Sequence, residues 1–410
     1  NRVRKYFIMA NLLDKASILL TPTAYNNGSM LSIKPTNGDG DFTFSRNGDA
    51  SRVNSSGIIV TEGANLPRIN YENGCGSWLL EPQSTNIIPY STDFSTWLYG
   101  SDGFPNNMTR VDGQSSPDGG TNSSLFTRNS GTNGFFGYGN STVVLGNTYT
   151  YSIFIKKGTS STFQIYNVAN SPQSKVTYNI DTDTFTQESN ASGKAVNFGD
   201  GWYRLSMTYE HTNTNGSVSQ VRNYLGDGES MYVFGSQLEE QSFATSYITT
   251  LGASSTRNRD LATDSGNSTL INSTEGTLYF EGAALANDGT NRYISINNGG
   301  TTDYLFFRYR SDNQFQVRYR SGNIDSLNTT FTLSNNLNFN KIAFSYKLNE
   351  FKIFVNGLQI GSTITIGGVF ATTVNSLDFE KFDGAENFYG KVKALAVYKE
   401  ALTDAELQSL

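Results

Sequence analysis

Cysteine and histidine are almost missing from this sequence. One cysteine, Cys75, and one histidine, His211, occur among 410 residues. A single cysteine excludes a disulfide within the chain. Transition-metal sites need several His or Cys ligands, and a nucleophilic triad needs a base beside its nucleophile, so the composition argues against both. We expect His211 in a turn or on the surface, and Cys75 as a small packed residue.

Charge and long apolar runs are also scarce. Charged residues make up 16% of the chain, and the net charge is -6. No basic stripe of the kind that nucleic-acid-binding proteins carry is present, and no segment approaches the ~20 apolar residues of a membrane helix. We therefore expect no nucleic-acid partner and no membrane insertion. Asp14 and Lys15 interrupt the apolar stretch near the N-terminus, which makes a poor signal peptide.

Aromatic residues and glycine are abundant instead. Aromatics reach 13% and glycines number 40, a composition typical of short strands joined by turns. Residues 149–157, 202–209 and 230–238 alternate apolar and polar side chains, which predicts strands. Because no helical pattern separates them, the sequence predicts an all-β protein built from β-sandwich or jelly-roll domains.

Three regions are expected along the chain. Residues 1–88 have few periodic runs and are interpreted as an extended N-terminal docking region. Residues 89–262 and 263–410 are interpreted as two sandwiches, with 252–268 as a linker between them. Asn356-Gly357 predicts a hairpin, and Thr403 with Glu406 predicts a capping box at the start of a short C-terminal helix.

Several short stretches resemble known proteins. The N-terminal ones are DFTFSR (41–46), ASRVN (50–54), LPRI (66–69) and LEPQSTN (80–86). Later ones are GWYR (201–204), GSQLEE (235–240), ATSYI (244–248) and TR (256–257). The first group resembles the N-terminal region of bacteriophage structural proteins of the fibre or minor virion type. The second group looks like a carbohydrate-binding-module-like sandwich found in such proteins.

The C-terminal region carries a separate resemblance. FKIFVNG (351–357) and YKEALTDAELQSL (398–410) are similar to the concanavalin A-like, laminin-G-like lectin family. The resemblance implies a lectin-like sandwich. It does not name a ligand, because such folds host many functions.

Paired carboxylates suited to glycoside cleavage are not apparent. Asp378 and Glu380 share a strand face, but Asp383 does not, and the pairs Asp181/Asp183 and Asp227/Glu229 flank turns. We therefore predict no enzymatic activity. We also predict no cofactor. Calcium is the one alternative, because the loops 37–41 and 225–229 could offer oxygen ligands, although neither matches a known calcium loop.

Carbohydrate recognition combines a flat aromatic face with planar polar groups. Aromatic side chains in turn-like or Gly-rich sequence are the candidate carbohydrate-binding residues: Trp97, Tyr99, Phe135, Phe136 and Tyr138. Packing is the more common role of such rings, and Trp202 is expected in the core. In the terminal domain, Asp303, Arg308 and Asn387 are weaker candidates.

The densest basic stretch alternates with aromatic residues in strand-like sequence. It contains Arg308, Arg310, Arg318 and Arg320. This pattern favours a solvated sheet face, and a groove for acidic polysaccharide is the alternative.

The resemblances together imply a non-enzymatic virion surface protein that adheres to cell-surface or environmental glycans. Its partners would be other virion proteins, further copies of itself (a trimer by analogy with phage fibres) and a glycan. The main alternative is a purely architectural capsid or fibre subunit. A glycan-cleaving depolymerase is a third hypothesis, which a paired-carboxylate cleft would revive.

Overall fold

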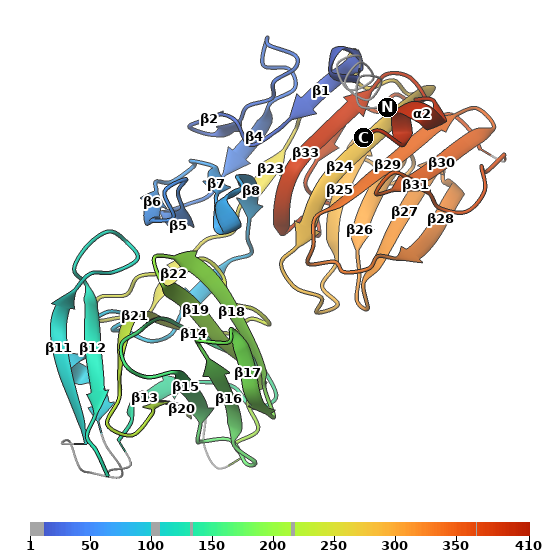
Figure 1. The fold of residues 1–410 in the computed structure, drawn as a ribbon. Coiled ribbons are helices and arrows are strands. Elements are labelled where there is room, and N and C mark those ends of the chain that lie inside the picture. The colour runs from blue at the N-terminus through green and yellow to red at the C-terminus, as the bar shows by residue number, and fades with distance from the viewer. Residues whose placement is uncertain (1–11, 100–106, 132–133, 215–217, 366) are drawn as a thin grey trace.

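The computed structural model describes residues 12–410 except 100–106, 132–133, 215–217 and 366. Almost every element in this part of the chain is a β-strand, which confirms the predicted all-β class. Figure 1 shows two large sandwiches with short N-terminal strands between them. No helix among the described residues is long and apolar enough to cross a membrane.

The middle sandwich consists of two six-stranded sheets. The first has the order β10 (Leu98–Tyr99), β13 (Phe136–Thr142), β20 (Val218–Leu225), β15 (Thr162–Asn167), β16 (Ser174–Asn179) and β17 (Thr184–Ser189). The second has the order β11 (Met108–Gln114), β12 (Ser123–Arg128), β21 (Ser230–Glu239), β14 (Thr148–Lys157), β19 (Trp202–Glu210) and β18 (Ser192–Gly199). Alternating side chains of both sheets meet in one core, as expected for a sandwich.

The C-terminal sandwich also has two sheets. The larger has the order β31 (Leu358–Gln359), β30 (Glu350–Val355), β29 (Asn340–Lys347), β24 (Glu275–Ala284), β33 (Gly390–Tyr398), β8 (Ser77–Leu80) and β7 (Arg68–Asn70), and β1 (Ala16–Leu20) also pairs with β33. The smaller has the order β28 (Ile324–Thr332), β27 (Gln314–Ser321), β26 (Tyr304–Tyr309), β25 (Arg292–Asn297) and β32 (Ser376–Asp378).

Two local predictions in this sandwich are confirmed. Asn356 and Gly357 join β30 to β31 with φ of 50° and 80°, the left-handed values that a tight hairpin needs. Helix α2 (Asp404–Leu407) begins with the predicted capping box, in which the Glu406 carboxylate accepts from the Thr403 backbone N–H at 2.9 Å.

The N-terminal region, interpreted from the sequence as an extended docking region, contributes strands to the C-terminal sandwich. β1, β7 and β8 are strands of the C-terminal sandwich, and Ile18, Ile69 and Trp78 are buried in its core. The region has few periodic runs because each of its strands is short and completes a sheet formed by distant residues. Whether it also contacts other proteins stays a prediction.

The region between the sandwiches contains further short strands. They are β2 (Tyr25–Asn26), β3 (Ser29–Met30), β4 (Phe42–Ser45), β5 (Ala50–Val53), β6 (Ile59–Glu62), β9 (Ser84–Asn86), β22 (Ser255–Arg257) and β23 (Leu261–Thr263), with the 3-10 turns η1 (Glu72–Gly74) and η2 (Phe94–Thr96). β22 pairs with β9 and β23 pairs with β4. The stretch 252–268 is thus paired with N-terminal strands and is not an unstructured linker.

Substitution of Ile18 tests this pairing. Ile18 is fully buried in the C-terminal core, so Ile18→Ala should destabilise that sandwich by about 2–5 kcal/mol. Hydrogen exchange of residues 390–398, the partner strand, should accelerate. Val111→Ala, at a side chain that is 55% exposed, is the matched control. Unchanged exchange in Ile18→Ala would show that the N-terminal strand does not support the sandwich.

Candidate functional site

The predicted carbohydrate-binding rings lie in the middle sandwich, mostly in its core. Trp97, Phe135 and Phe136 are 4%, 4% and 0% exposed. Phe136 stacks on Phe126 with ring centroids 4.1 Å apart, and Trp97 contacts both Phe136 and Tyr138. These buried rings hold the two sheets together and present no free face for a sugar to stack on.

Part of the Gly-rich sequence around these rings, expected to be a loop, belongs to strand β13 (Phe136–Thr142). Phe136 begins β13, and a side chain on Gly137 would clash with the backbone of Val221 in β20. The glycine therefore reflects close approach of two strands. Tyr138 is half-buried, and the side chain of Tyr99 lies outside the described part of the structure. Sugar binding at Tyr138 and Tyr99 stays a prediction.

Three further expectations about single residues can be compared with the structure. His211, expected in a turn or on the surface, is fully buried in the segment that follows a strand, and Cys75 is exposed instead of packed. Trp202 is 3% exposed and packs on Phe154 and other rings, which confirms its expected place in a core. His211 follows the end of β19, where its backbone N–H donates to Asn147 and its carbonyl accepts from Gly146.

The acidic side chains that came closest to a catalytic pair have structural partners. The Asp378 carboxylate is buried and accepts from the Asp264 backbone N–H at 2.6 Å and from Asn297 Nδ2 at 2.7 Å. Burial raises the pKa of Asp378, and the same effect, followed by the Asp378 charge, raises the pKa of Glu380. Glu380 accepts from Asn387 Nδ2 at 3.2 Å. These bonds tie β32 to its neighbours.

The loop residues proposed for calcium form a polar recess with Asp264. Asp39 and Asp41 line it, but Asp39 accepts from Asn37, and Asp41 accepts from the Ser32 backbone N–H at 2.7 Å. Among the described residues, no group of three or more His, Cys, Asp or Glu side chains is arranged to hold a metal ion.

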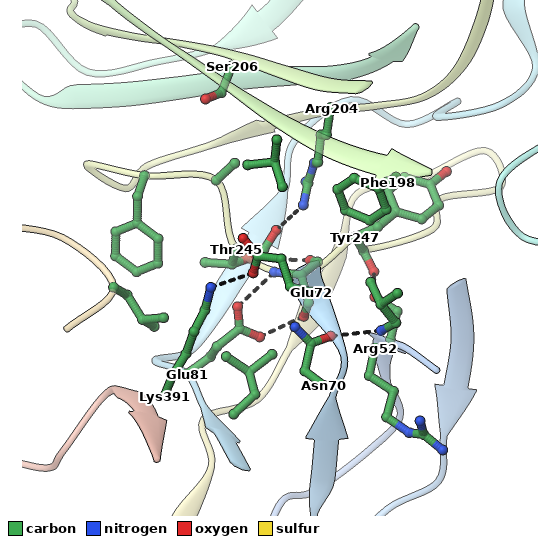
Figure 2. Close-up of a pocket in the computed structure, with 18 of the residues that line it drawn as sticks. Arg52, Asn70, Glu72, Glu81, Phe198, Arg204, Ser206, Thr245, Tyr247 and Lys391 are labelled. Atoms are coloured by element: carbon green, nitrogen blue, oxygen red, sulfur yellow. Dashed lines mark hydrogen bonds and ion pairs between the residues drawn. The ribbon is translucent and has the colours of Figure 1, made fainter. Parts of the chain in front are cut away.

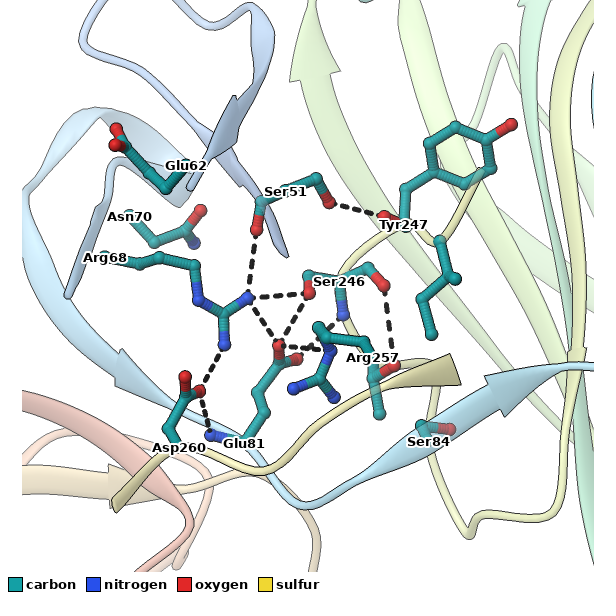
Figure 3. Close-up of polar contacts among 12 residues, drawn as sticks. Ser51, Glu62, Arg68, Asn70, Glu81, Ser84, Ser246, Tyr247, Arg257 and Asp260 are labelled. Atoms are coloured by element: carbon teal, nitrogen blue, oxygen red, sulfur yellow. Dashed lines mark hydrogen bonds and ion pairs between the residues drawn. The ribbon is translucent and has the colours of Figure 1, made fainter. Parts of the chain in front are cut away.

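The short stretches that resemble other proteins meet at one buried ion network, drawn in Figure 3. Arg68 lies between two carboxylates: its Nη1 is 2.8 Å from Glu81 Oε2, and its Nη2 contacts Asp260. Arg46 Nη1 is 3.1 Å from Asp260, and Arg257 Nε is 3.6 Å from Glu81. All five side chains are 3% exposed or less.

Hydrogen bonds complete the network from the middle sandwich. Ser246 donates to Glu81 through its hydroxyl at 2.6 Å and its backbone N–H at 2.7 Å. Burial alone would raise the pKa of Glu81, but the charges of Arg257 and Arg68, with the Ser246 bonds, lower that pKa to about 2. The network joins residues from the N-terminal strands, the middle sandwich and the 252–268 stretch, so these stretches fix the junction between the sandwiches.

A different surface is formed by the outward side of the five-stranded sheet. In β26, Leu305, Phe307 and Tyr309 point into the C-terminal core, so Tyr304, Phe306 and Arg308 point the other way. We call the outward residues of this sheet the arginine face: Tyr293, Tyr304, Phe306, Arg308, Gln316, Arg318, Arg320 and Asn328. It contains three arginines of the basic stretch.

Aromatic rings form the floor of the arginine face. Phe382, from the segment after β32, stacks on Tyr304 with centroids 3.8 Å apart. Arg318 and Arg320 both lie 5.7 Å from the Tyr304 ring centre, and both pair with Asp325, at 2.6 and 2.9 Å. Their side chains are 25% and 26% exposed, so they remain accessible to a ligand.

Two polar atoms of the arginine face have no hydrogen-bond partner among the described residues. They are Arg308 Nε and Gln316 Oε1, both buried. Arg308 Nη1 donates to Tyr293 Oη at 2.8 Å, and Gln316 Nε2 donates to Asn328 Oδ1 at 2.6 Å, so each side chain is held with one polar atom unused. These two atoms mark polar groups whose hydrogen bonding is incomplete beneath the partly exposed guanidinium groups of Arg318 and Arg320.

The weaker candidates Asp303 and Asn387 are both buried and hydrogen-bonded within the protein, and Asn387 donates to Glu380. Asp303 is fully buried, and its carboxylate accepts from the backbone N–H groups of Ala371 at 2.7 Å and Gly322 at 3.2 Å. The alternation of Arg and aromatic residues in the sequence was the signal for the face. No sequence pattern indicated that Gln316 and Asn328 belong to this face, because only the strand register places them beside Arg318.

The chain matches one known family over part of its length. Residues 256–408 match the concanavalin A-like lectin/glucanases superfamily, which agrees with the two-sheet geometry of the C-terminal sandwich. A comparison with curated proteins finds no match. The C-terminal part is therefore a lectin-like sandwich, and the resemblance of the middle sandwich to carbohydrate-binding modules stays a prediction.

Three solved structures illustrate the similarity in fold. The carbohydrate-binding module CBM40 of the Ruminococcus gnavus IT-sialidase is 18% identical, over 34% of this chain and 84% of its own, with a TM-score of 0.31. Domain 4 of a Geobacillus stearothermophilus arabinanase, solved with arabinotriose, is 14% identical, over 37% and 71%, with a TM-score of 0.31. A SAP-like pentraxin of Limulus polyphemus is 13% identical, over 33% and 68%, with a TM-score of 0.27. At these values the similarity does not bear on function.

The ion network predicts an acid-sensitive junction. The folded-state pKa of Glu81 is about 2, below its ordinary 4.5, so its ionisation stabilises the fold above pH 4.5. That stability, roughly 3 kcal/mol, should be lost as the pH falls from 4.5 towards 2. Urea unfolding across this range measures the loss.

Glu81→Gln should be less stable at pH 7 by about 3–5 kcal/mol, because it leaves buried arginines without their full charge partner. Its stability should also change less with pH between 4.5 and 2. Glu210→Gln, at an exposed acid of β19, is the control and should behave as the unmodified chain. Equal acid sensitivity of both variants would assign the loss to other groups.

Proposed function

We propose that this chain is a non-enzymatic, glycan-binding structural protein on the surface of a bacteriophage particle. The observation that carries the glycan-binding part is the arginine face, in which the partly exposed guanidinium groups of Arg318 and Arg320 lie beside the ring of Tyr304. The lectin-like fold of residues 256–408 supports it as a scaffold for a sugar. The virion origin rests on the resemblance of the N-terminal stretches alone.

The charge of the face selects an acidic polysaccharide as the ligand. Arg318 and Arg320 pair with Asp325, and the neighbouring Lys381 pairs with Asp383 and Glu386, in a chain whose net charge is -6. Guanidinium groups form bidentate hydrogen bonds with carboxylates, and they bind planar oxyanions more strongly than neutral hydroxyls. The alternative that the sequence offered for the basic stretch, a surface for acidic polysaccharide, is thus the one we adopt.

The absence of catalysis is part of the proposal. The carboxylates of Asp378 and Glu380 accept hydrogen bonds that organise β32, and Asp181 pairs with Lys157 at 2.6 Å. Glycoside cleavage needs one free acid and one free base across a sugar bond. Incubation with polysaccharide should therefore produce no new reducing ends.

Substitution of Arg308 tests the binding surface. Arg308→Gln keeps a planar polar group but removes the charge, so affinity for polygalacturonate should fall about tenfold or more. Biolayer interferometry with immobilised polysaccharide measures it, with dextran as the neutral comparison. Raising the salt from 0.05 to 0.5 M should weaken binding of the unmodified chain, since the contacts are ionic.

Two matched variants make the outcome specific. Arg110→Gln removes an arginine from β11 of the middle sandwich and should leave affinity unchanged. Tyr138→Ala tests the sugar site that the sequence predicted in the same sandwich. Loss of binding in Tyr138→Ala but not in Arg308→Gln would place the glycan in the middle sandwich and contradict our assignment.

An architectural role without glycan is the second candidate, and the buried ion network favours it. Residues of that network come from the stretches that resemble virion proteins, and they fix the relative placement of the two sandwiches. A stable oligomer by light scattering, with a trimer expected, and no binding to any polysaccharide would establish this role. The arginine face would then be a contact surface for other virion proteins.

A further inference from the structure

A pocket lies where the middle sandwich, the N-terminal strands and the C-terminal sandwich meet. Its volume is about 120 Å³, several times the space that one water molecule needs. Figure 2 shows Arg204 and Lys391 approaching from opposite sides, with Asn70 and Glu72 between them and Phe198 and Tyr247 beside them. A second recess shares Val53, Glu72 and Phe198 with it, so the pocket continues into a groove between η1 and β18.

Most charges at the pocket are already paired. Glu72 pairs with Lys391, Arg52 pairs with Glu62 at 2.5 Å, and Glu81 belongs to the ion network. Lys194 and Arg204 take part in none of the ion pairs found among the described residues, and the acids whose charges act on them most are Glu72 and Glu239 respectively. The pocket is thus lined by two cations that its own acids, Glu72 and Glu81, balance only in part.

Arg204 is the more unusual of the two. It is 7% exposed, its Nη1 donates to the Thr245 carbonyl at 2.6 Å and its Nη2 to Ser152 Oγ at 2.9 Å, both neutral acceptors. Its Nε has no hydrogen-bond partner in the described chain. Burial lowers the pKa of Arg204, since desolvation of a guanidinium without an ion-pair partner is unfavourable.

The rest of the lining suits a sugar ring. Phe198 and Phe243 are half-buried and offer apolar ring surface, while Asn70 and Ser206 offer an amide and a hydroxyl. Aromatic surface receives the C–H side of a sugar, and planar or hydroxyl groups receive its hydroxyls. Lys194 is exposed, so the pocket is reached from solvent on that side.

We propose that this junction pocket binds one acidic sugar unit of the uronic acid class. The carboxylate would lie between Lys194 and Arg204, and the ring would lie against Phe198. This site is separate from the arginine face and does not rest on the proposed function. Because parts of both sandwiches line the pocket, a bound sugar would also hold them together.

Cys75 gives a direct way to observe binding. It is the one cysteine of the chain, it is exposed, and it follows Gly74, which lines the adjoining groove. An environment-sensitive fluorophore attached to Cys75 should respond saturably to galacturonate. Galactose, which lacks the carboxylate, should bind about tenfold more weakly or not at all. Calorimetry on the unlabelled chain is the independent measurement.

Lys194→Gln should weaken galacturonate binding about tenfold or more, because a charge-assisted hydrogen bond is lost from an exposed position that the fold does not need. Ala244→Phe, which fills the pocket without changing charge, should abolish binding. Lys175→Gln, on β16 in the other sheet of the middle sandwich, is the matched control.

Binding should persist in Arg308→Gln, which separates this site from the arginine face. Three results would overturn the proposal: no saturable galacturonate binding by the unmodified chain, unchanged affinity in Lys194→Gln, or equal affinity for galactose. Acetate binding as tight as galacturonate would show a simple anion site and would overturn the assignment to a sugar.

Discussion

The contact of Arg68 with Glu81 and Asp260 is the constraint on which the arrangement of the protein depends. Arg68 ends one sheet of the C-terminal sandwich, Asp260 lies in the segment that returns from the middle sandwich, and Ser246 binds the same Glu81. A buried charge without its partner costs several kcal/mol. These segments therefore adopt their positions together, because displacing one of them would leave a buried charge without its partner. Glu81 also lines the junction pocket, so the ion network fixes the positions of the segments that form this pocket.

The two candidate binding surfaces use arginine in opposite ways. On the arginine face, Arg318 and Arg320 share Asp325 and lie over an aromatic ring, so their charge is partly used within the protein. At the junction, Arg204 donates to neutral oxygens alone and keeps its charge available. The first arrangement suits a long ligand that makes many weak contacts, and the second suits one small anion.

The sequence predicted what short-range patterns determine. Alternation in 149–157 and 230–238 located β14 and β21, and Asn356-Gly357 located a hairpin. It did not predict that β1 and β8 complete the C-terminal sheet, because those strands are short and their partner β33 lies more than 300 residues further along the chain. Aromatic rings in Gly-rich sequence were interpreted as loop residues, yet Gly137 is needed for close strand packing. The burial of Trp97 could not be predicted from local sequence either, because it depends on the packing of both sheets.

The connectivity of the C-terminal sandwich has a consequence for synthesis on the ribosome. Strands β1 and β8 are translated early, but their common partner β33 is among the last segments made. The whole middle sandwich is translated in between, and its own strands pair only with one another or with nearby residues. The middle sandwich can fold while the apolar side chains of β1 and β8 are still without their packing partners. The C-terminal core can therefore be completed only after β33 has been translated.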